Sequence, residues 1–321
     1  MQSKTLAACR AALLGLAVGD ALGVPVEFQA RAIRQLDPVE GMRSFGTHDQ
    51  PAGTWSDDSS LAFCLAEALA ADAGITDAAR RFIKWYEEGY WTPRGTVFDV
   101  GIATAEALRR LKQGRPASAS GGTDEYDNGN GSLMRMLPLA FRMQHLPVLE
   151  RFELVRKYSA ITHAHIRTVL GCFIYVEMAC QLLLASDKLT AYQAMQHTVR
   201  EFLSTSGVAP DEEIAHYQRI LEVPAVPEAQ PLADCAEDEI MSSGYVVHTL
   251  EAALWCLLGH DSYRATVLAA VNLGDDTDTV GAVAGGLAGL LYGEAAIPAE
   301  WLAVLARRAD IEELAARLVT E

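Results

Sequence analysis

The chain has 321 residues, of which 50% are hydrophobic and 21% are charged. This composition predicts a folded chain with a large buried core and excludes an intrinsically disordered one. Aspartate and glutamate number 42 against 26 lysines and arginines, so the formal net charge is −16. Such a chain lacks the clustered cations that neutralise phosphates, so we expect no direct nucleic-acid binding. The surplus of carboxylates suits divalent cations such as Mg²⁺.

In nearly every segment the apolar residues recur at helical spacing, which predicts an all-α fold, a compact multi-helix bundle forming one domain over residues 1–321. The first helices are expected over 5–18, from 59 onward, from an N-cap at Thr76 and Asp77, and over 102–112. Further helices are expected over 133–143, 147–158, 165–184, 189–203, 211–221, 245–258, 262–271, 279–291 and from 299 to the end.

Loops are expected over 115–131, which is rich in Gly, Ser and Asn, and over 222–239, which contains three prolines. Gly281, Gly285 and Gly289 fall on one face of an expected helix, where another backbone can approach closely. The six cysteines form no C-x-x-C pair and lie mostly in apolar segments, which predicts reduced core residues and a cytoplasmic location.

The opening segment 1–19 has early positive charges and a short apolar run, as a secretory signal has, but Arg10 interrupts that run. The longest uncharged stretch, 280–293, is glycine-rich and shorter than the about 20 apolar residues that span a bilayer. We therefore expect no membrane anchor.

Two acidic clusters stand directly before expected helices: GTWSDDSSL, with Ser56, Asp57 and Asp58, and NLGDDTDTVGA, with Asp275, Asp276, Asp278 and Thr279. N-capping is one interpretation, and it is favoured for Ser56 or Asp275 alone. Each cluster, however, collects several anions with no lysine or arginine inside it. Because hard divalent cations bind carboxylate and hydroxyl oxygens, we favour a site for one or two Mg²⁺ or Mn²⁺ ions.

Two glycine-containing segments add weaker signals. In GDALGVPVEF, Asp20 and Glu27 flank an expected turn after the first helix, although Glu27 is equally consistent with a surface glutamate. In DNGNGSLMRMLPL, a loop over 128–132 leads into an expected helix. Amides at a helix N-terminus suit a diphosphate, and an ordinary turn is the alternative.

Together these segments resemble the ADP-ribosylglycohydrolase family, whose bacterial prototype is the dinitrogenase reductase-activating glycohydrolase. The likeness covers almost the whole chain, and the family's motifs occur in order: GDALGVPVEF, WSDDSS, GNGSLMR, and GYVVHTLEAALW followed by NLGDDTDTVGA. The resemblance implies an all-α orthogonal bundle with two Mg²⁺ or Mn²⁺ ions in a cleft. The ligands that it implies are Ser56, where the family usually has threonine, Asp57, Asp58, Asp276, Asp278 and Thr279.

The resemblance also implies catalytic and substrate-binding residues. Glu27 matches a glutamate that ligates metal or organises the attacked centre, and Asp99 matches an aspartate that positions or deprotonates water. Without the resemblance, Asp99 would be interpreted as the N-cap of the helix over 102–112. The implied substrate contacts are Gly129, Asn130, Gly131 and Ser132 to the distal ribose and diphosphate, His163 at the cleft rim, and Tyr245 on adenine. A structural histidine and a core tyrosine are the alternatives for the last two.

The implied activity is metal-dependent hydrolysis of the N-glycosidic bond between ADP-ribose and a protein side chain, with arginine favoured. The partners are then an ADP-ribosylated protein and the product ADP-ribose. One alternative is another linkage, to serine, a nucleobase or a small metabolite. The other is an ADP-ribose-binding or immunity protein that blocks an ADP-ribosylating toxin. The full set of acidic residues favours the enzyme.

Overall fold

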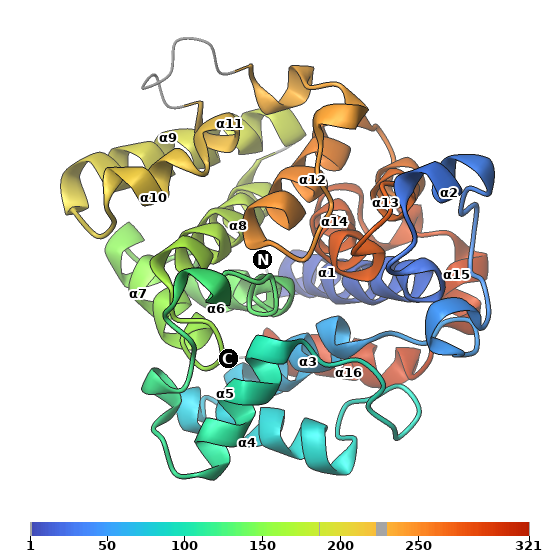
Figure 1. Cartoon of the computed structure of the whole chain (residues 1–321), viewed down its shortest axis with the longest axis horizontal. Coiled ribbons are helices and arrows are strands. Elements are labelled where there is room, and N and C mark those ends of the chain that lie inside the picture. Colours follow the sequence, from blue (N-terminus) through green and yellow to red (C-terminus); the bar gives the residue numbers. More distant parts are fainter. Residues whose placement is uncertain (1, 186, 223–229, 321) are drawn as a thin grey trace.

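The computed structural model describes residues 2–185, 187–222 and 230–320, and this part of the chain is helical with no β-strand (Figure 1). The all-α prediction is therefore confirmed. The α-helices are α1 Gln2–Gly23, α2 Arg31–Leu36, α3 Asp57–Ala70, α4 Gly74–Glu88, α5 Ile102–Lys112, α6 Ala140–Met143, α7 Val148–Ser159, α8 Ile166–Leu184, α9 Lys188–Ser206, α10 Asp211–Ala215, α11 Gln218–Leu221, α12 Val246–Gly259, α13 Tyr263–Asn272, α14 Thr277–Tyr292, α15 Ala299–Val304 and α16 Arg308–Leu318. The 3₁₀ helices are η1 Val24–Val26, η2 Gly46–His48, η3 Ala117–Ala119, η4 Glu125–Asp127, η5 Leu133–Arg135, η6 Leu137–Leu139, η7 Leu232–Asp234, η8 Glu237–Glu239 and η9 Glu294–Ala296.

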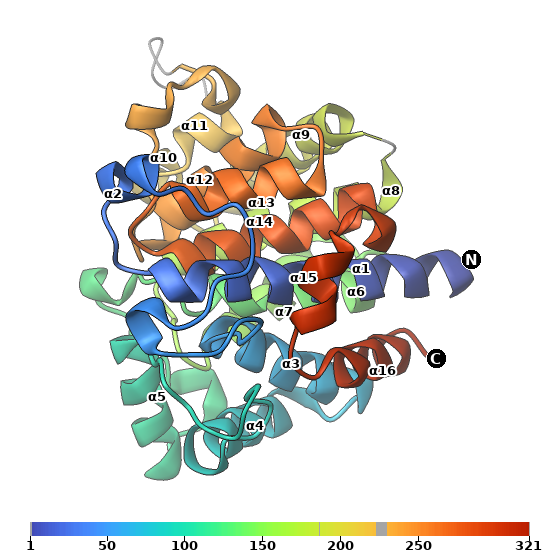
Figure 2. The same ribbon diagram turned by 90° about the vertical axis from the view of Figure 1, so that its right-hand side faces the viewer.

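Helices α1 and α14 lie side by side in the middle of the molecule (Figures 1 and 2). A Cβ added to Gly19 would lie 1.9 Å from the carbonyl oxygen of Gly281, and one added to Gly15 would lie 2.4 Å from that of Gly285. Residue numbers fall in one helix as they rise in the other, so the two helices run antiparallel. The predicted close approach at the glycine face is therefore confirmed, and its partner is α1.

The first helix is longer than expected, because it continues through Gly23. The predicted turn after residue 18 is wrong: Gly19 and Gly23 remain helical, since their missing side chains let α14 pack against them. Two segments, Lys4–Val26 and Ile166–Leu184, are long and apolar enough to cross a membrane, but 83% of each apolar window is buried inside the fold. Both therefore have the burial of core helices.

Three expected helices are interrupted. The 133–143 segment forms η5, η6 and the single turn of α6, because Pro138 cannot donate within a regular helix. The 211–221 segment breaks into α10 and α11, and the buried Tyr217 between them donates to the carbonyl oxygen of Arg167 at 2.6 Å. The last helix breaks into α15 and α16 at Arg307, whose φ is +50°.

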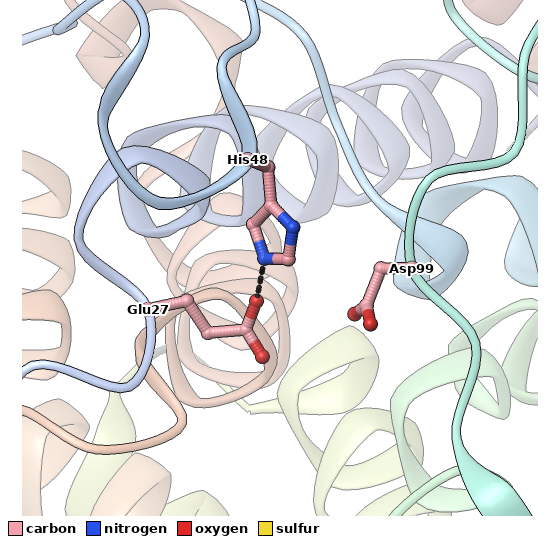
Figure 3. Close-up of side chains that lie close together, drawn as sticks. All are labelled: Glu27, His48 and Asp99. Atoms are coloured by element: carbon pink, nitrogen blue, oxygen red, sulfur yellow. Dashed lines mark hydrogen bonds and ion pairs between the residues drawn. The ribbon is translucent and has the colours of Figure 1, made fainter.

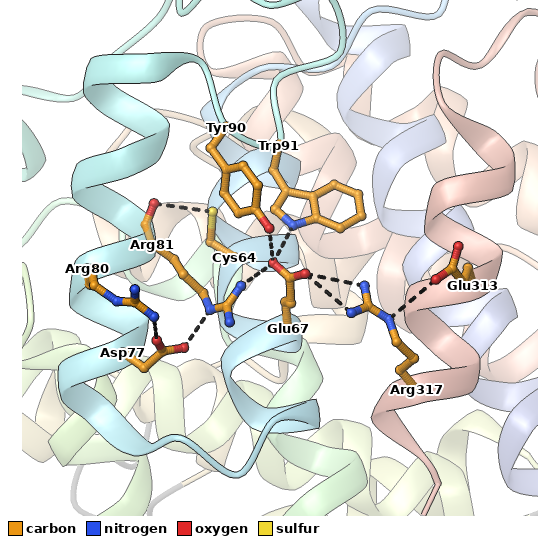
Figure 4. Close-up of polar contacts among 9 residues, drawn as sticks. All are labelled: Cys64, Glu67, Asp77, Arg80, Arg81, Tyr90, Trp91, Glu313 and Arg317. Atoms are coloured by element: carbon orange, nitrogen blue, oxygen red, sulfur yellow. Dashed lines mark hydrogen bonds and ion pairs between the residues drawn. The ribbon is translucent and has the colours of Figure 1, made fainter.

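Helix α4 begins at Gly74 and not at the predicted N-cap, Thr76 and Asp77. The Asp77 carboxylate instead accepts hydrogen bonds from Arg80 and Arg81 within α4 (Figure 4). Arg81 also pairs with Glu67 of α3, and Glu67 pairs with Arg317 of α16. One charged network thus joins α3, α4 and α16.

One connected hydrophobic core contains residues from α1 through α16. The six cysteines are free and buried, which confirms their prediction as core residues. The cytoplasmic location and the single-domain organisation stay predictions. Part of the predicted loop over 222–239 lies outside the described residues, and its end contains η7 and η8.

Candidate active site

Acidic side chains from the end of α1 and the beginnings of α3 and α14 meet inside the molecule. Ligand oxygens of Asp20, Asp58 and Asp278 lie within 4.8 Å of one another. The same holds for oxygens of Glu27, Asp276 and Asp278, so Asp278 belongs to both groups. The fold therefore brings together acidic residues from both sequence clusters. It adds Asp20, which the ligand prediction had not included.

The first cluster is shaped by the N-terminus of α3. Ser56 is the N-cap, as expected for this residue alone: its hydroxyl oxygen lies 3.3 Å from the N–H of Asp58. The same hydroxyl donates to Asp58 Oδ2 at 2.8 Å, so Ser56 also orients a candidate ligand. Asp57 is buried but lies outside the groups of close oxygens. After burial, the charges of Asp99 and Asp20 contribute most to the raised pKa of Asp57.

The second cluster begins with a backbone in the left-handed region. Asp275 has a φ of +57°, and its N–H and C=O pair with the backbone of Gln29 and Phe28 at 2.8 and 2.7 Å. The alternative of Asp275 as the N-cap is therefore wrong, because Asp276 occupies that position. One turn later the Thr279 hydroxyl donates to Asp58 Oδ2 at 3.4 Å, which connects the two clusters.

Burial and neighbouring like charges raise the free energy of the ionised form of these carboxyl groups. Burial, followed by the charges of neighbouring carboxylates, raises the pKa values of Asp57, Asp58 and Asp278 well above their ordinary value. Burial raises the pKa of Asp20 and of Glu27 to about 7, against hydrogen bonds that lower both. Within the described ranges, no lysine or arginine forms an ion pair with any of the five.

Two buried carboxylate oxygens, Asp58 Oδ1 and Asp278 Oδ2, have no hydrogen-bond partner among the described residues. Buried polar atoms are nearly always paired, and each group has an unpaired oxygen that is available to bind a cation. Carboxylate and hydroxyl oxygens are the ligands that Mg²⁺ and Mn²⁺ prefer. The residues present therefore fit a divalent cation.

A third group, Glu27, His48 and Asp99, adjoins the acidic centre (Figure 3). The Nε2 atom of His48 forms a hydrogen bond with Glu27 Oε2, and this bond raises the pKa of His48. The interpretation of Asp99 as an N-cap is wrong, because Gly101 precedes α5 in that position. Sequence reasoning missed His48, because it lies in the irregular η2 region and no motif marks it.

The 128–132 loop pairs with the segment before α12. The N–H of Asn130 donates to Gly244 and that of Val246 to Asn128, both at 3.0 Å. The continuous helix expected after the loop is wrong, since the short elements η5, η6 and α6 follow it instead. The Ser132 hydroxyl is buried and lies 2.9 Å from that of Ser159, and its substrate role stays a prediction.

The two remaining substrate residues also contact this loop. His163 is 2% exposed and lies beneath Gly131, not at a rim. Burial, and then the charge of Arg135, lowers the pKa of His163 to about 3, so the ring is neutral. Tyr245 is partly buried before α12, with its ring centroid 4.9 Å from that of His248. The substrate roles of His163 and Tyr245 stay predictions.

Comparisons with known proteins agree with this architecture. A solved ADP-ribosylglycohydrolase-related protein complex matches with a TM-score of 0.79 and 32% identity, covering 99% of this chain and 98% of that one. ADP-ribosylarginine hydrolase Tri1 of Pseudomonas putida is 35% identical over 96% of this chain and 77% of its own length. Tri1 of Serratia proteamaculans is 33% identical over 99% of this chain and 80% of its own length. The ADP-ribosyl-[dinitrogen reductase] glycohydrolase of Rhodospirillum rubrum is 28% identical over 94% of this chain and 91% of its own length. Because the ADP-ribosylglycohydrolase family model also matches residues 1–321, the chain belongs to the ADP-ribosylglycohydrolase family, a family of glycohydrolase enzymes.

Proposed function

We propose that this protein is a divalent-cation-dependent hydrolase that removes ADP-ribose from modified arginine side chains of proteins. The observation that carries the proposal is the pair of buried, unpartnered oxygens, Asp58 Oδ1 and Asp278 Oδ2. The arginine linkage is supported by two relatives above 30% identity that are named ADP-ribosylarginine hydrolase.

Two Mg²⁺ or Mn²⁺ ions would be held by oxygens of the two acidic clusters, with Asp278 central because it belongs to both groups of close carboxylates. Bound divalent cations would supply positive charge to the ribose hydroxyls and lower the pKa of a bound water. Ser56 and Thr279 hold Asp58 through hydrogen bonds, which fixes one carboxylate of the centre.

Asp99 is the stronger candidate for the base, because Glu27 already pairs with His48. The water oxygen bonds to C1″ of the ribose, and one water proton passes to Asp99. The C–N bond breaks, the guanidino nitrogen keeps the bonding pair, and the neutral guanidine takes the proton from Asp99. A carboxylate within reach of the attacking water contributes about 10²- to 10⁴-fold to such a reaction.

The experiment compares proteins that carry ADP-ribose on arginine, on serine and on a nucleobase. We expect release from arginine, with kcat lowered about 10²-fold or more by Asp99→Asn and ADP-ribose affinity retained. Release from another linkage alone would contradict the arginine assignment. Tight ADP-ribose binding without release from any substrate would contradict the hydrolase and favour the binding or immunity role.

A further inference from the structure

Phe28 is an exposed aromatic residue that directly follows Glu27. It is 68% exposed, and its φ of +62° lies in the left-handed region. Bulky residues rarely adopt this conformation, which glycine or asparagine adopts with less strain. The N–H of Phe28 donates to the carbonyl oxygen of Asp275 at 2.7 Å, which holds the backbone in place. The turn therefore explains the conformation of residue 28 but not the choice of phenylalanine, which adds strain and exposes apolar surface.

The ring of Phe28 belongs to a row of three rings beside the acidic centre. Its centroid lies 6.1 Å from that of His48, and the centroid of His48 lies 5.2 Å from that of Phe98. Phe98 is partly buried and the His48 ring is bonded to Glu27, whereas Phe28 is largely exposed. Phe28 is therefore the ring of this row that is open to a ligand.

A carboxylate accompanies each end of the row. Glu27 directly precedes Phe28 in the chain, and Asp99 directly follows Phe98. Their oxygens and a ring nitrogen of His48 lie within 4.8 Å of one another (Figure 3). Among the residues that the structure describes, neither carboxylate pairs with a lysine or an arginine. The place therefore has the charge and the aromatic surface that suit a guanidinium group, whose edge donates to carboxylates and whose face stacks on rings.

The proposed reaction brings a guanidino group to this place. Asp99 gives a proton to the departing guanidine, so a guanidino nitrogen must lie within hydrogen-bond reach of the Asp99 carboxylate when the C–N bond breaks. Before the bond breaks, the guanidinium group is a planar cation. The face of a phenylalanine ring attracts such a cation, because the ring quadrupole is negative there.

We propose that Phe28 is a specificity-determining residue whose ring stacks against the guanidinium group of the ADP-ribosylated arginine. The proposal rests on the proposed function and adds to it the residue that recognises arginine. A serine-linked substrate has no cation at this position, so Phe28 favours the arginine linkage over the serine linkage.

The test is steady-state hydrolysis of an ADP-ribosylarginine peptide by the full-length protein in saturating Mg²⁺, with free ADP-ribose as a competitive inhibitor. The substrate contains the guanidinium group and the inhibitor lacks it, so their comparison isolates the arginine side of the site. In Phe28→Ala we expect kcat/KM to fall about 3- to 30-fold, as for loss of a cation–π contact, while the inhibition constant of ADP-ribose changes less than about 2-fold. Phe28→Tyr keeps an aromatic ring and should keep the wild-type kcat/KM. Phe28→Leu keeps apolar bulk without a ring and should be as impaired as Phe28→Ala.

Phe45→Ala is the matched control. Phe45 is 58% exposed and has a φ of +66°, so it shares the exposure and the backbone region of Phe28. Its ring contacts no other ring in the part of the chain that the structure describes. This variant should keep the wild-type kcat/KM.

Three results would overturn the assignment of Phe28. They are a wild-type kcat/KM in Phe28→Ala, an equal weakening of substrate and ADP-ribose in that variant, and full activity of Phe28→Leu. If the wild type released no ADP-ribose from the peptide, the proposed function would be wrong, and the assignment of Phe28 with it.

Discussion

The carboxylate of Asp20, on α1, accepts hydrogen bonds from both the backbone N–H and the hydroxyl of Ser59, on α3, at 3.0 and 2.6 Å. Its other oxygen accepts the N–H of Ser56 at 2.8 Å. A carboxylate from one helix thus caps the N-terminus of another, which carries the acidic pair Asp57 and Asp58. Asp20 therefore fixes the N-terminus of α3, which carries the candidate ligand Asp58.

Replacing Asp20 by alanine should leave the buried N–H groups of Ser56 and Ser59 without partners. We expect the free energy of unfolding in EDTA to fall by about 2–4 kcal/mol, and the affinity for Mg²⁺ to fall with it. Urea unfolding and calorimetry measure the two effects. Ser59→Ala removes only the hydroxyl and should cost about 1 kcal/mol. Equal stability of Asp20→Ala and the wild type would contradict the role.

Relative to the wild type, the Asp278→Asn variant should be more stable in EDTA and less stable in saturating Mg²⁺. In EDTA we expect the variant to be more stable than the wild type by about 1–2 kcal/mol, because a buried charge is removed from among like charges. Saturating Mg²⁺ should stabilise the wild type, by about 2.7 kcal/mol at 100 times the Kd, and the variant hardly at all. Thermal unfolding measures both, with the exposed Asp275→Asn as the control. An equal Mg²⁺ response in Asp278→Asn and the wild type would count against the site.

Glu67 should contribute stability that depends on pH (Figure 4). Partial burial raises the pKa of Glu67, but the hydrogen bonds from Tyr90 and Trp91 and the charges of Arg81 and Arg317 outweigh it and lower the pKa below 4.5. The contribution is therefore fully present above the unfolded pKa and is lost as the pH falls through the folded one.

We expect Glu67→Gln to lower stability at pH 7 by about 1–3 kcal/mol and to remove part of the acid sensitivity of the wild type. Urea unfolding across the acidic range measures this. Glu313→Gln is the control, because Glu313 pairs with Arg317 on the surface with 73% of its side chain exposed. A Glu67→Gln variant that loses stability in acid as steeply as the wild type would contradict the assignment.

Gly281→Ala should destabilise the fold strongly, because the added Cβ would lie 2.5 Å from the carbonyl oxygen of Gly19. Neither backbone can move without separating α1 from α14, so we expect a loss of about 3 kcal/mol or more. Gly259→Ala is the matched control, since nothing lies within 4 Å of its added Cβ. Thermal unfolding that fails to distinguish the two would contradict the close packing of α1 on α14.

The features that could be predicted from the sequence are those that depend on residues close together in the chain. The cap at Ser56 is visible in the sequence because it acts within one helical turn. The glycines at 281, 285 and 289 are visible because they repeat every four residues along a single helix. The long helices follow from periodicity in the same way, whereas Pro138 interrupts the helix that periodicity predicts over 133–143.

Partners that are distant in the sequence could not be predicted. Asp20 caps a helix 36 residues away, and Asn130 reaches Asp276 across 146 residues. His48 joins the site from an irregular segment in which no spacing marks it. The resemblance predicts His163 at a cleft rim, but its burial depends on how the 128–132 loop folds over it.

The most direct test of the account is release of ADP-ribose from an ADP-ribosylarginine protein after EDTA treatment, followed by return of Mg²⁺ or Mn²⁺. A metal centre built on Asp58 and Asp278 predicts no release in EDTA, recovery when either cation returns, and no recovery in Asp278→Asn. Release that continues undiminished in EDTA, or full activity of Asp278→Asn with added Mg²⁺, would contradict a metal centre built on Asp58 and Asp278.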